Sequence, residues 1–171
     1  MGPNTAGGWL LAAVLALGAA GSASAQTTTS HGREYGVTRR ATGSFEVRLT
    51  PQPVHAEAEG IVGRRSIAKQ FRGELAGTSV GEMLSYWAAE TSSGAYVVIE
   101  RFTGTVGGRT GSFLLAHKGI MERGGGPPLD ISVVPDSDDG ELKGIAGTMD
   151  IILEGGRHDY VFEYTLPDQG S

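Results

Sequence analysis

The chain has 171 residues and no cysteine. This absence excludes disulfide bonds, redox chemistry through thiols and anchoring by a lipid attached to cysteine. The folded part of the chain must therefore be held together by its hydrophobic core alone.

Long apolar runs are also missing, apart from one near the start of the chain. Residues 9–17 read WLLAAVLAL, too short to span a bilayer, and the small residues Ala23-Ser24-Ala25 end the segment that follows. This pattern predicts a signal peptide over residues 1–25, cleavage after Ala25, and export to the periplasm or the extracellular space. An uncleaved membrane anchor is the main alternative, because residues 1–8 contain no Lys or Arg. After cleavage we expect no stable membrane insertion.

Positive charge is scarce, and the net charge is -5. This balance argues against a nucleic-acid partner, and the pairs Arg39-Arg40 and Arg64-Arg65 are too short to reverse it. We interpret both pairs as solvated surface charge.

The length predicts a single domain. Removing 25 of the 171 residues leaves 146, the size of one domain with one core. Residues 26–40 are rich in Thr, Ser and Gly and predict a flexible leader. We therefore place the domain at residues 41–166 and a C-terminal tail at 167–171.

Within this domain, short runs of alternating apolar and polar residues are separated by glycine-bearing turns. The pattern is typical of an all-β sandwich or barrel. A helix over residues 82–90 is the one helical alternative, and strand is favoured there. The expected strands are 42–49, 66–73, 73–80, 81–90, 95–106, 109–121, 129–134, 145–153 and 157–166, of which two adjacent ones can form a single bent strand.

Two Gly-Gly pairs, Gly107-Gly108 and Gly155-Gly156, predict two-residue hairpin turns, because glycine tolerates the positive φ angles that such turns need. Counting outward from each turn predicts these cross-strand pairs: Phe102 with Phe113, Glu100 with Leu115, Val98 with His117, Ile151 with Tyr160, and Met149 with Phe162. The first hairpin thereby places Glu100 and His117 on one otherwise apolar face.

Six segments occur in this order: 41–47 (ATGSFEV), 69–75 (KQFRGEL), 100–104 (ERFTG), 108–113 (GRTGSF), 133–137 (VVPDS) and 140–147 (GELKGIAG). Together they resemble the bacterial family known as domain of unknown function 3224. The resemblance covers about residues 41–166 and implies a single eight-stranded antiparallel β-barrel, similar to allene oxide cyclase and the dirigent proteins. It also implies a possible homo-oligomer. The family has no assigned activity, so the resemblance implies a shape more than a function.

Glu100 and His117 are the candidate catalytic residues. Burial in an apolar barrel disfavours a charged carboxylate, and a neighbouring imidazole can offset this, so the pair could transfer protons. The alternative is structural: Glu100 satisfies backbone donors or Arg109, and His117 packs as a neutral side chain.

Six aromatic residues are candidates for binding a ligand inside the barrel. They are Tyr86, Tyr96, Phe102, Phe113, Tyr160 and Phe162. Aromatic side chains on inward faces also form ordinary cores, and this is the alternative for all six.

We expect neither a metal nor a cofactor. The acidic residues Asp136, Asp138, Asp139 and Glu141 raise the possibility of a calcium loop, but Gly147 stands where such a loop needs a bidentate Glu. We therefore interpret this segment as a solvated turn. The histidines form no spaced ligand pair for zinc.

Three hypotheses about function remain open. The first is an exported barrel that binds a small apolar ligand without a cofactor. The second is a cofactor-free cyclase or isomerase that uses Glu100. The third is a structural or self-associating barrel with a filled interior.

Overall fold

The computed structural model describes residues 37–168. The predicted signal peptide lies outside these residues, as do most of the predicted leader and residues 169–171 of the tail. The elements are β1 (Arg39–Gln52), the 3-10 helix η1 (Ala56–Ala58), β2 (Gly63–Gly73), β3 (Leu75–Ala88), β4 (Ser93–Val106), β5 (Arg109–Met121), β6 (Asp130–Val133), β7 (Asp139–Gly140), β8 (Ala146–Glu154) and β9 (Arg157–Thr165).

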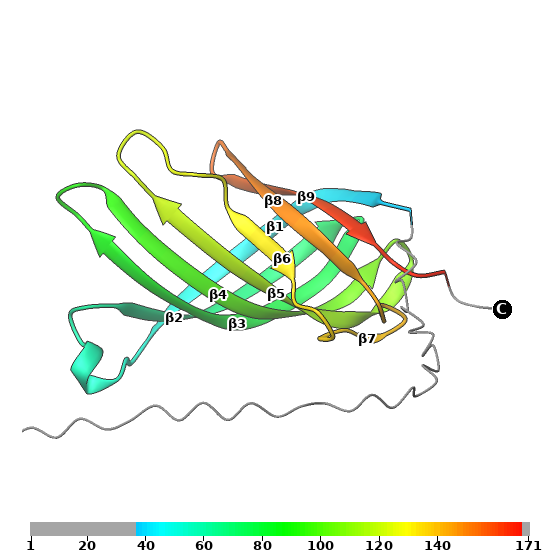
Figure 1. Ribbon diagram of the computed structural model, residues 1–171, viewed down its shortest axis with the longest axis horizontal. Coiled ribbons are helices and arrows are strands. Elements are labelled where there is room, and N and C mark those ends of the chain that lie inside the picture. Colours follow the sequence, from blue (N-terminus) through cyan, green and yellow to red (C-terminus); the bar gives the residue numbers. More distant parts are fainter. Residues whose placement is uncertain (1–36, 169–171) are drawn as a thin grey trace, which may run out of the picture. The chain divides into compact units, whose positions relative to one another are not determined.

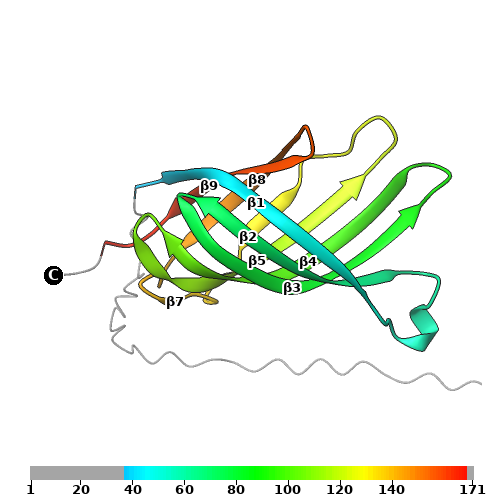
Figure 2. The ribbon, with the colours of Figure 1, turned by 180° about the vertical axis from the view of Figure 1, so that it is seen from behind.

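The strands close into an antiparallel barrel. The order around the ring is β4-β3-β2-β1-β9-β8-β6-β5, and β5 pairs again with β4 to close it (Figure 1). The short β7 pairs with β5 and adds no strand to the ring. The reverse view shows β1 crossing from the wall of the barrel toward η1 (Figure 2). The predicted all-β, eight-stranded antiparallel barrel is confirmed.

Both predicted hairpin registers are confirmed. Gly107 and Gly108 form the first turn with φ of 57° and 82°, and Gly155 and Gly156 form the second with 58° and 80°. The cross-strand pairs are the expected ones, including Phe102 with Phe113 and Val98 with His117. In the second hairpin Met149 lies opposite Phe162.

Several strand ends differ from the expected ones, and two adjacent expected segments join into one strand, as the sequence allowed. The segments 73–80 and 81–90 form the single strand β3, so the helical alternative over 82–90 is wrong. The first strand begins at Arg39, two residues before the expected start of the domain, because it pairs with β9 from there on. Among residues 37–168 the one helical element is η1, and no helix there is long and apolar enough to cross a membrane.

Aromatic rings fill one half of the barrel. Phe71 and Phe102 meet edge to face with centroids 5.7 Å apart, and Phe113 stacks on Phe162 at 5.8 Å. The hydroxyl of Tyr160 accepts a hydrogen bond from the Leu75 backbone N–H at 2.9 Å, which ties the core to the start of β3. These rings are fully buried, so this half of the barrel is a packed core.

Gly81 on β3 lies directly opposite Glu100 on β4. A Cβ atom at this position would collide with the carbonyl oxygen of Ile99 and lie 2.5 Å from the Cα of Glu100. The absence of a side chain therefore lets β3 and β4 approach at the point where Glu100 enters the interior.

We expect the substitution Gly81→Ala to lower the free energy of unfolding by about 1–3 kcal/mol, because the added methyl group overpacks this junction. Gly63→Ala on β2 is the matched control, since its Cβ would meet no atom closer than the Ser85 hydroxyl oxygen at 3.3 Å. Urea denaturation of both variants measures the difference, and equal losses would contradict this role for Gly81.

Candidate functional site

Four polar side chains lie buried together inside the barrel. They are Lys69, Ser79, Glu100 and His117, which come from the neighbouring strands β2, β3, β4 and β5. Each stands at an inward position of its strand, because successive strand residues alternate between the two faces. Lys69 lies directly opposite Ser79, while His117 is diagonal to Glu100. We call these four residues the buried polar cluster.

Glu100 is the centre of this cluster and is fully buried. Its Oε1 accepts a hydrogen bond from the Lys69 ammonium at 2.6 Å, and its Oε2 accepts one from the Ser79 hydroxyl at 2.6 Å. Both carboxylate oxygens are thus held in place by short, charge-assisted hydrogen bonds.

The third partner, His117, is close to Glu100 but poorly aligned with it. Its Nε2 lies 2.8 Å from Oε1 of Glu100. The contact is short enough for a hydrogen bond, but its geometry is poor, and no well-aligned hydrogen bond reaches Nε2 from the described residues. We therefore treat it as a close electrostatic contact between the imidazole and the carboxylate.

The surroundings hold Glu100 in its charged form. Burial alone would raise the pKa of Glu100, but the His117 imidazole and the Lys69 ammonium outweigh it and lower this pKa to about 2. Burial lowers the pKa of Lys69, and the charge and hydrogen bond of Glu100 partly offset this. The short contact between Lys69 and Glu100 is therefore a buried ion pair.

The Lys69 ammonium keeps donors to spare. An ammonium carries three N–H donors, and within residues 37–168 Glu100 is the only hydrogen-bond acceptor found for them. The charge also lies 4.8 Å from the centroid of the Phe45 ring, where cation–π attraction stabilises it. Lys69 can therefore donate to a further acceptor.

A pocket opens next to the cluster, and both Lys69 and His117 contribute to its wall. Its volume is about 200 Å³. Leu49 and Leu153 belong to its lining and are 44% and 66% exposed, which places its mouth at the end of the barrel that carries the β8–β9 turn. The remaining lining residues are Phe45, Val47, Ile67, Met83, Tyr96, Val98, Leu129, Ile151 and His158.

The predicted inward placement of Glu100 and His117 is confirmed, and the structure brings them into contact. Glu100 itself is not part of the pocket wall, because Lys69 and His117 separate it from the cavity. Its carboxylate therefore acts on the pocket through these two neighbours.

The six aromatic candidates are distributed over three locations. Tyr96 lines the pocket, and burial, together with the negative charge of Glu100, raises the pKa of its hydroxyl. Tyr86 points outward and is 52% exposed, because it stands at an even-numbered, outer position of β3. The other four lie in the packed half of the barrel, away from this pocket: Phe102, Phe113, Tyr160 and Phe162.

Two members of the cluster, Lys69 and Ser79, were not predicted from the sequence as site residues. A signal was present, since Lys69 stands between Ile67 and Phe71 in strict alternation and so shares their inward face. The connection from β2 to β3 has no Gly-Gly turn from which to count, and the register that joins Lys69 to Ser79 stayed unrecognised.

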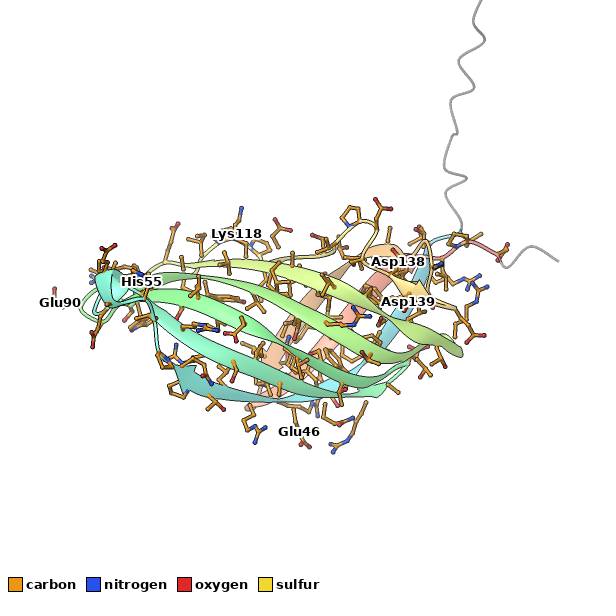
Figure 3. All side chains as sticks on the ribbon, turned by 90° about the horizontal axis from the view of Figure 1, so that it is seen from below. Glu46, His55, Glu90, Lys118, Asp138 and Asp139 are labelled. Atoms are coloured by element: carbon orange, nitrogen blue, oxygen red, sulfur yellow. The ribbon has the colours of Figure 1, made fainter. Side chains whose placement is uncertain are left out.

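The acidic loop uses its carboxylates to cap backbone groups. Asp138 accepts a hydrogen bond from the Gly144 N–H at 2.6 Å, and Glu141 accepts one from the Thr110 N–H at 2.8 Å. Figure 3 shows Asp138 and Asp139 toward the opposite end of the barrel from His55. In the described part of the chain, no group of three or more His, Asp or Glu side chains is arranged to hold a metal ion.

Apolar side chains also gather on the outer face of β3 and β4. Leu84 lies directly opposite Val97, and both are about half exposed, as are their neighbours Tyr86 and Ile99. Exposed apolar groups of this kind often mark contact surfaces. Self-association of the chain stays a prediction, and this outer face is where substitutions would test it.

We expect Glu100→Gln to lower the free energy of unfolding by about 3–5 kcal/mol, because it leaves the Lys69 charge buried without a counter-ion. The double variant Lys69→Met/Glu100→Gln removes both charges and should recover most of this loss. Urea denaturation at neutral pH measures each variant. Losses that simply add would contradict the ion pair.

The same ion pair predicts sensitivity to acid. The pKa of Glu100 falls from an ordinary 4.5 to about 2 on folding, so its contribution to stability is fully present above pH 4.5 and is lost as the pH falls toward 2. The unfolding free energy of the native chain should therefore drop more steeply over this range than that of Glu100→Gln. Parallel denaturation curves across the range would argue against it.

Comparisons with known proteins identify the family. The family model described as "Protein of unknown function (DUF3224)" matches residues 41–164. A solved structure of a protein of unknown function from the DUF3224 family of Shewanella oneidensis MR-1 is similar, with 44% sequence identity and a TM-score of 0.71. The match covers 78% of this chain and 100% of that one. A search of curated proteins finds no match.

The similarity extends over most of the barrel, from the first residues of β1 to the last part of β9. It includes all four strands that supply the buried polar cluster. The chain therefore belongs to the DUF3224 family of proteins of unknown function.

Proposed function

We propose that this protein binds a small, mainly apolar molecule in the pocket at the open end of the barrel, without a cofactor. The observation that carries the proposal is that two buried polar side chains, Lys69 and His117, belong to the wall of an otherwise largely apolar cavity. Polar groups in the wall of an apolar cavity can orient a ligand and give the site its specificity. Lys69, with its spare N–H groups, offers a second contact in the same place.

The size of the pocket limits the ligand. Its volume of about 200 Å³ exceeds the roughly 150 Å³ that suffices to hold a benzene molecule in an engineered protein cavity. A single substituted ring or a short branched chain fits this space, and a longer tail would extend through the mouth.

Binding is better supported than proton-transfer catalysis by Glu100. A general acid or base must reach the reacting atom and titrate near the working pH. Glu100 lies behind Lys69 and His117, and its pKa of about 2 keeps it ionised and only weakly basic. We therefore assign Glu100 the role of holding Lys69 and His117 in position.

The proposal is tested by narrowing the pocket. We expect Val47→Trp to abolish the binding of 4-methylacetophenone, a neutral probe with one ring and one carbonyl, because the indole would occupy the cavity that Val47 lines. Arg48→Trp is the matched control, since its side chain lies on the exposed outer face of the same strand. Saturation-transfer NMR with the native chain and both variants measures binding. Equal signals for Val47→Trp and the native chain would overturn the assignment of this pocket.

We further propose that the protein acts outside the cytoplasm, and residues 1–25 of the sequence support this. When the full chain is produced in a bacterium, the exported form should begin at Gln26, because the small-residue site ends at Ala25. Intact mass spectrometry of the periplasmic and culture fractions measures this. A full-length product confined to the cytoplasm would contradict export.

A further inference from the structure

We propose that the ligand carries a carboxylate that lies between Lys69 and His117, and that its binding places a proton on His117. This inference rests on the proposed function and specifies the chemical class of the ligand. It follows from the charges that surround the pocket.

At the base of the pocket, the charges of Lys69 and Glu100 balance each other. The ammonium of Lys69 and the carboxylate of Glu100 form a 2.6 Å ion pair in which both side chains are almost fully buried. A second carboxylate brought into this space adds a negative charge at low dielectric, which is unfavourable unless another positive charge appears. Binding of such a ligand therefore requires a protein group beside the pocket that can become positive.

His117 is placed to supply that charge. Its side chain is 3% exposed, it lines the pocket, and its Nε2 already lies 2.8 Å from Oε1 of Glu100. Histidine is the side chain that commonly changes charge between pH 5 and 8. A protonated His117 would have Glu100 on one side and the ligand carboxylate on the other, each as a counter-ion.

The other groups around His117 agree with this arrangement. From β4 the titratable neighbours are Glu100 and Tyr96, and from β2 the charged neighbour is Lys69. On β6 the residue opposite His117 is the apolar Ile131, while Asp130 pairs with the outward Lys118. Glu100 is thus the one carboxylate in contact with His117 in the described chain.

Tyr96 and His158 complete the polar part of the pocket. The raised pKa of Tyr96 keeps its hydroxyl protonated at neutral pH, so it can donate to a carboxylate oxygen. His158 lines the pocket from β9 and packs on Phe45, with ring centroids 5.1 Å apart. It provides a control for the role of His117, because it is the other titratable imidazole in the same wall.

The probe is 4-methylbenzoate, and its neutral isostere 4-methylbenzamide has nearly the same shape. Isothermal titration calorimetry of the mature native chain at several pH values compares the two. We expect 4-methylbenzoate to bind more tightly as the pH falls from about 8 to about 6, with a net uptake of protons on binding. The affinity of 4-methylbenzamide should not depend on pH.

Two variants separate the role of His117 from that of its neighbours. His117→Gln should remove the pH dependence and the proton uptake, whereas His158→Gln should keep both. Circular dichroism and thermal melting establish that each variant is folded. If His117→Gln does not fold, the pH dependence of the His117 ring signals in histidine-labelled native protein, with and without 4-methylbenzoate, provides the same test.

The outcomes distinguish this inference from the proposed function. Binding of 4-methylacetophenone together with pH-independent or absent binding of 4-methylbenzoate would overturn the carboxylate assignment and leave the pocket as a binding site. If the affinity for 4-methylbenzoate still depends on pH in a folded His117→Gln variant, the role of His117 would also be overturned. Failure of all three probes to bind would overturn the proposed function as well.

Discussion

The buried ion pair between Lys69 and Glu100 is the interaction on which the polar site of this barrel depends. Burying two charges costs several kcal/mol per ion, and the short contact must offset most of that cost. Ser79 and His117 complete the surroundings of the carboxylate, so that four adjacent strands converge on one group. Apolar residues of similar volume would fill the same space with equal or greater stability. We therefore attribute the role of the ion pair to the two polar side chains, Lys69 and His117, that it holds in the pocket wall.

This cluster separates two parts of the barrel interior that follow one another along the barrel axis. On one side the aromatic rings are packed against each other and sealed by the hydrogen bonds of Tyr160. On the other side lies the cavity, with Lys69 and His117 in its wall. The inward-facing residues thus line both a packed part and a hollow part of the same barrel.

The residue pattern was sufficient for an all-β fold and for half of the cluster, while the eight-stranded barrel followed from the family resemblance. The Gly-Gly turns fixed the register of two hairpins, and this alone predicted that Glu100 and His117 share the inner face. Lys69 was not predicted as part of the site, because the turn that joins its strand to the next has no Gly-Gly pair from which to count the register. The aromatic candidates show a second limit: alternation tells which face a residue occupies, but not whether its level along the barrel is packed or hollow. Phe102 and Tyr96 share one face of β4, yet only Tyr96 reaches the pocket.

The central claim is that Glu100 is ionised inside the barrel and holds the two side chains that face the pocket. The most direct test is a pH titration of the side-chain carboxyl carbon of Glu100, observed by ¹³C NMR in the folded protein and assigned with Glu100→Gln. The account predicts that the signal of the ionised form persists as the pH falls past 4.5, the ordinary pKa, toward about 2. A protonation midpoint at or above 4.5 in the folded protein would contradict it.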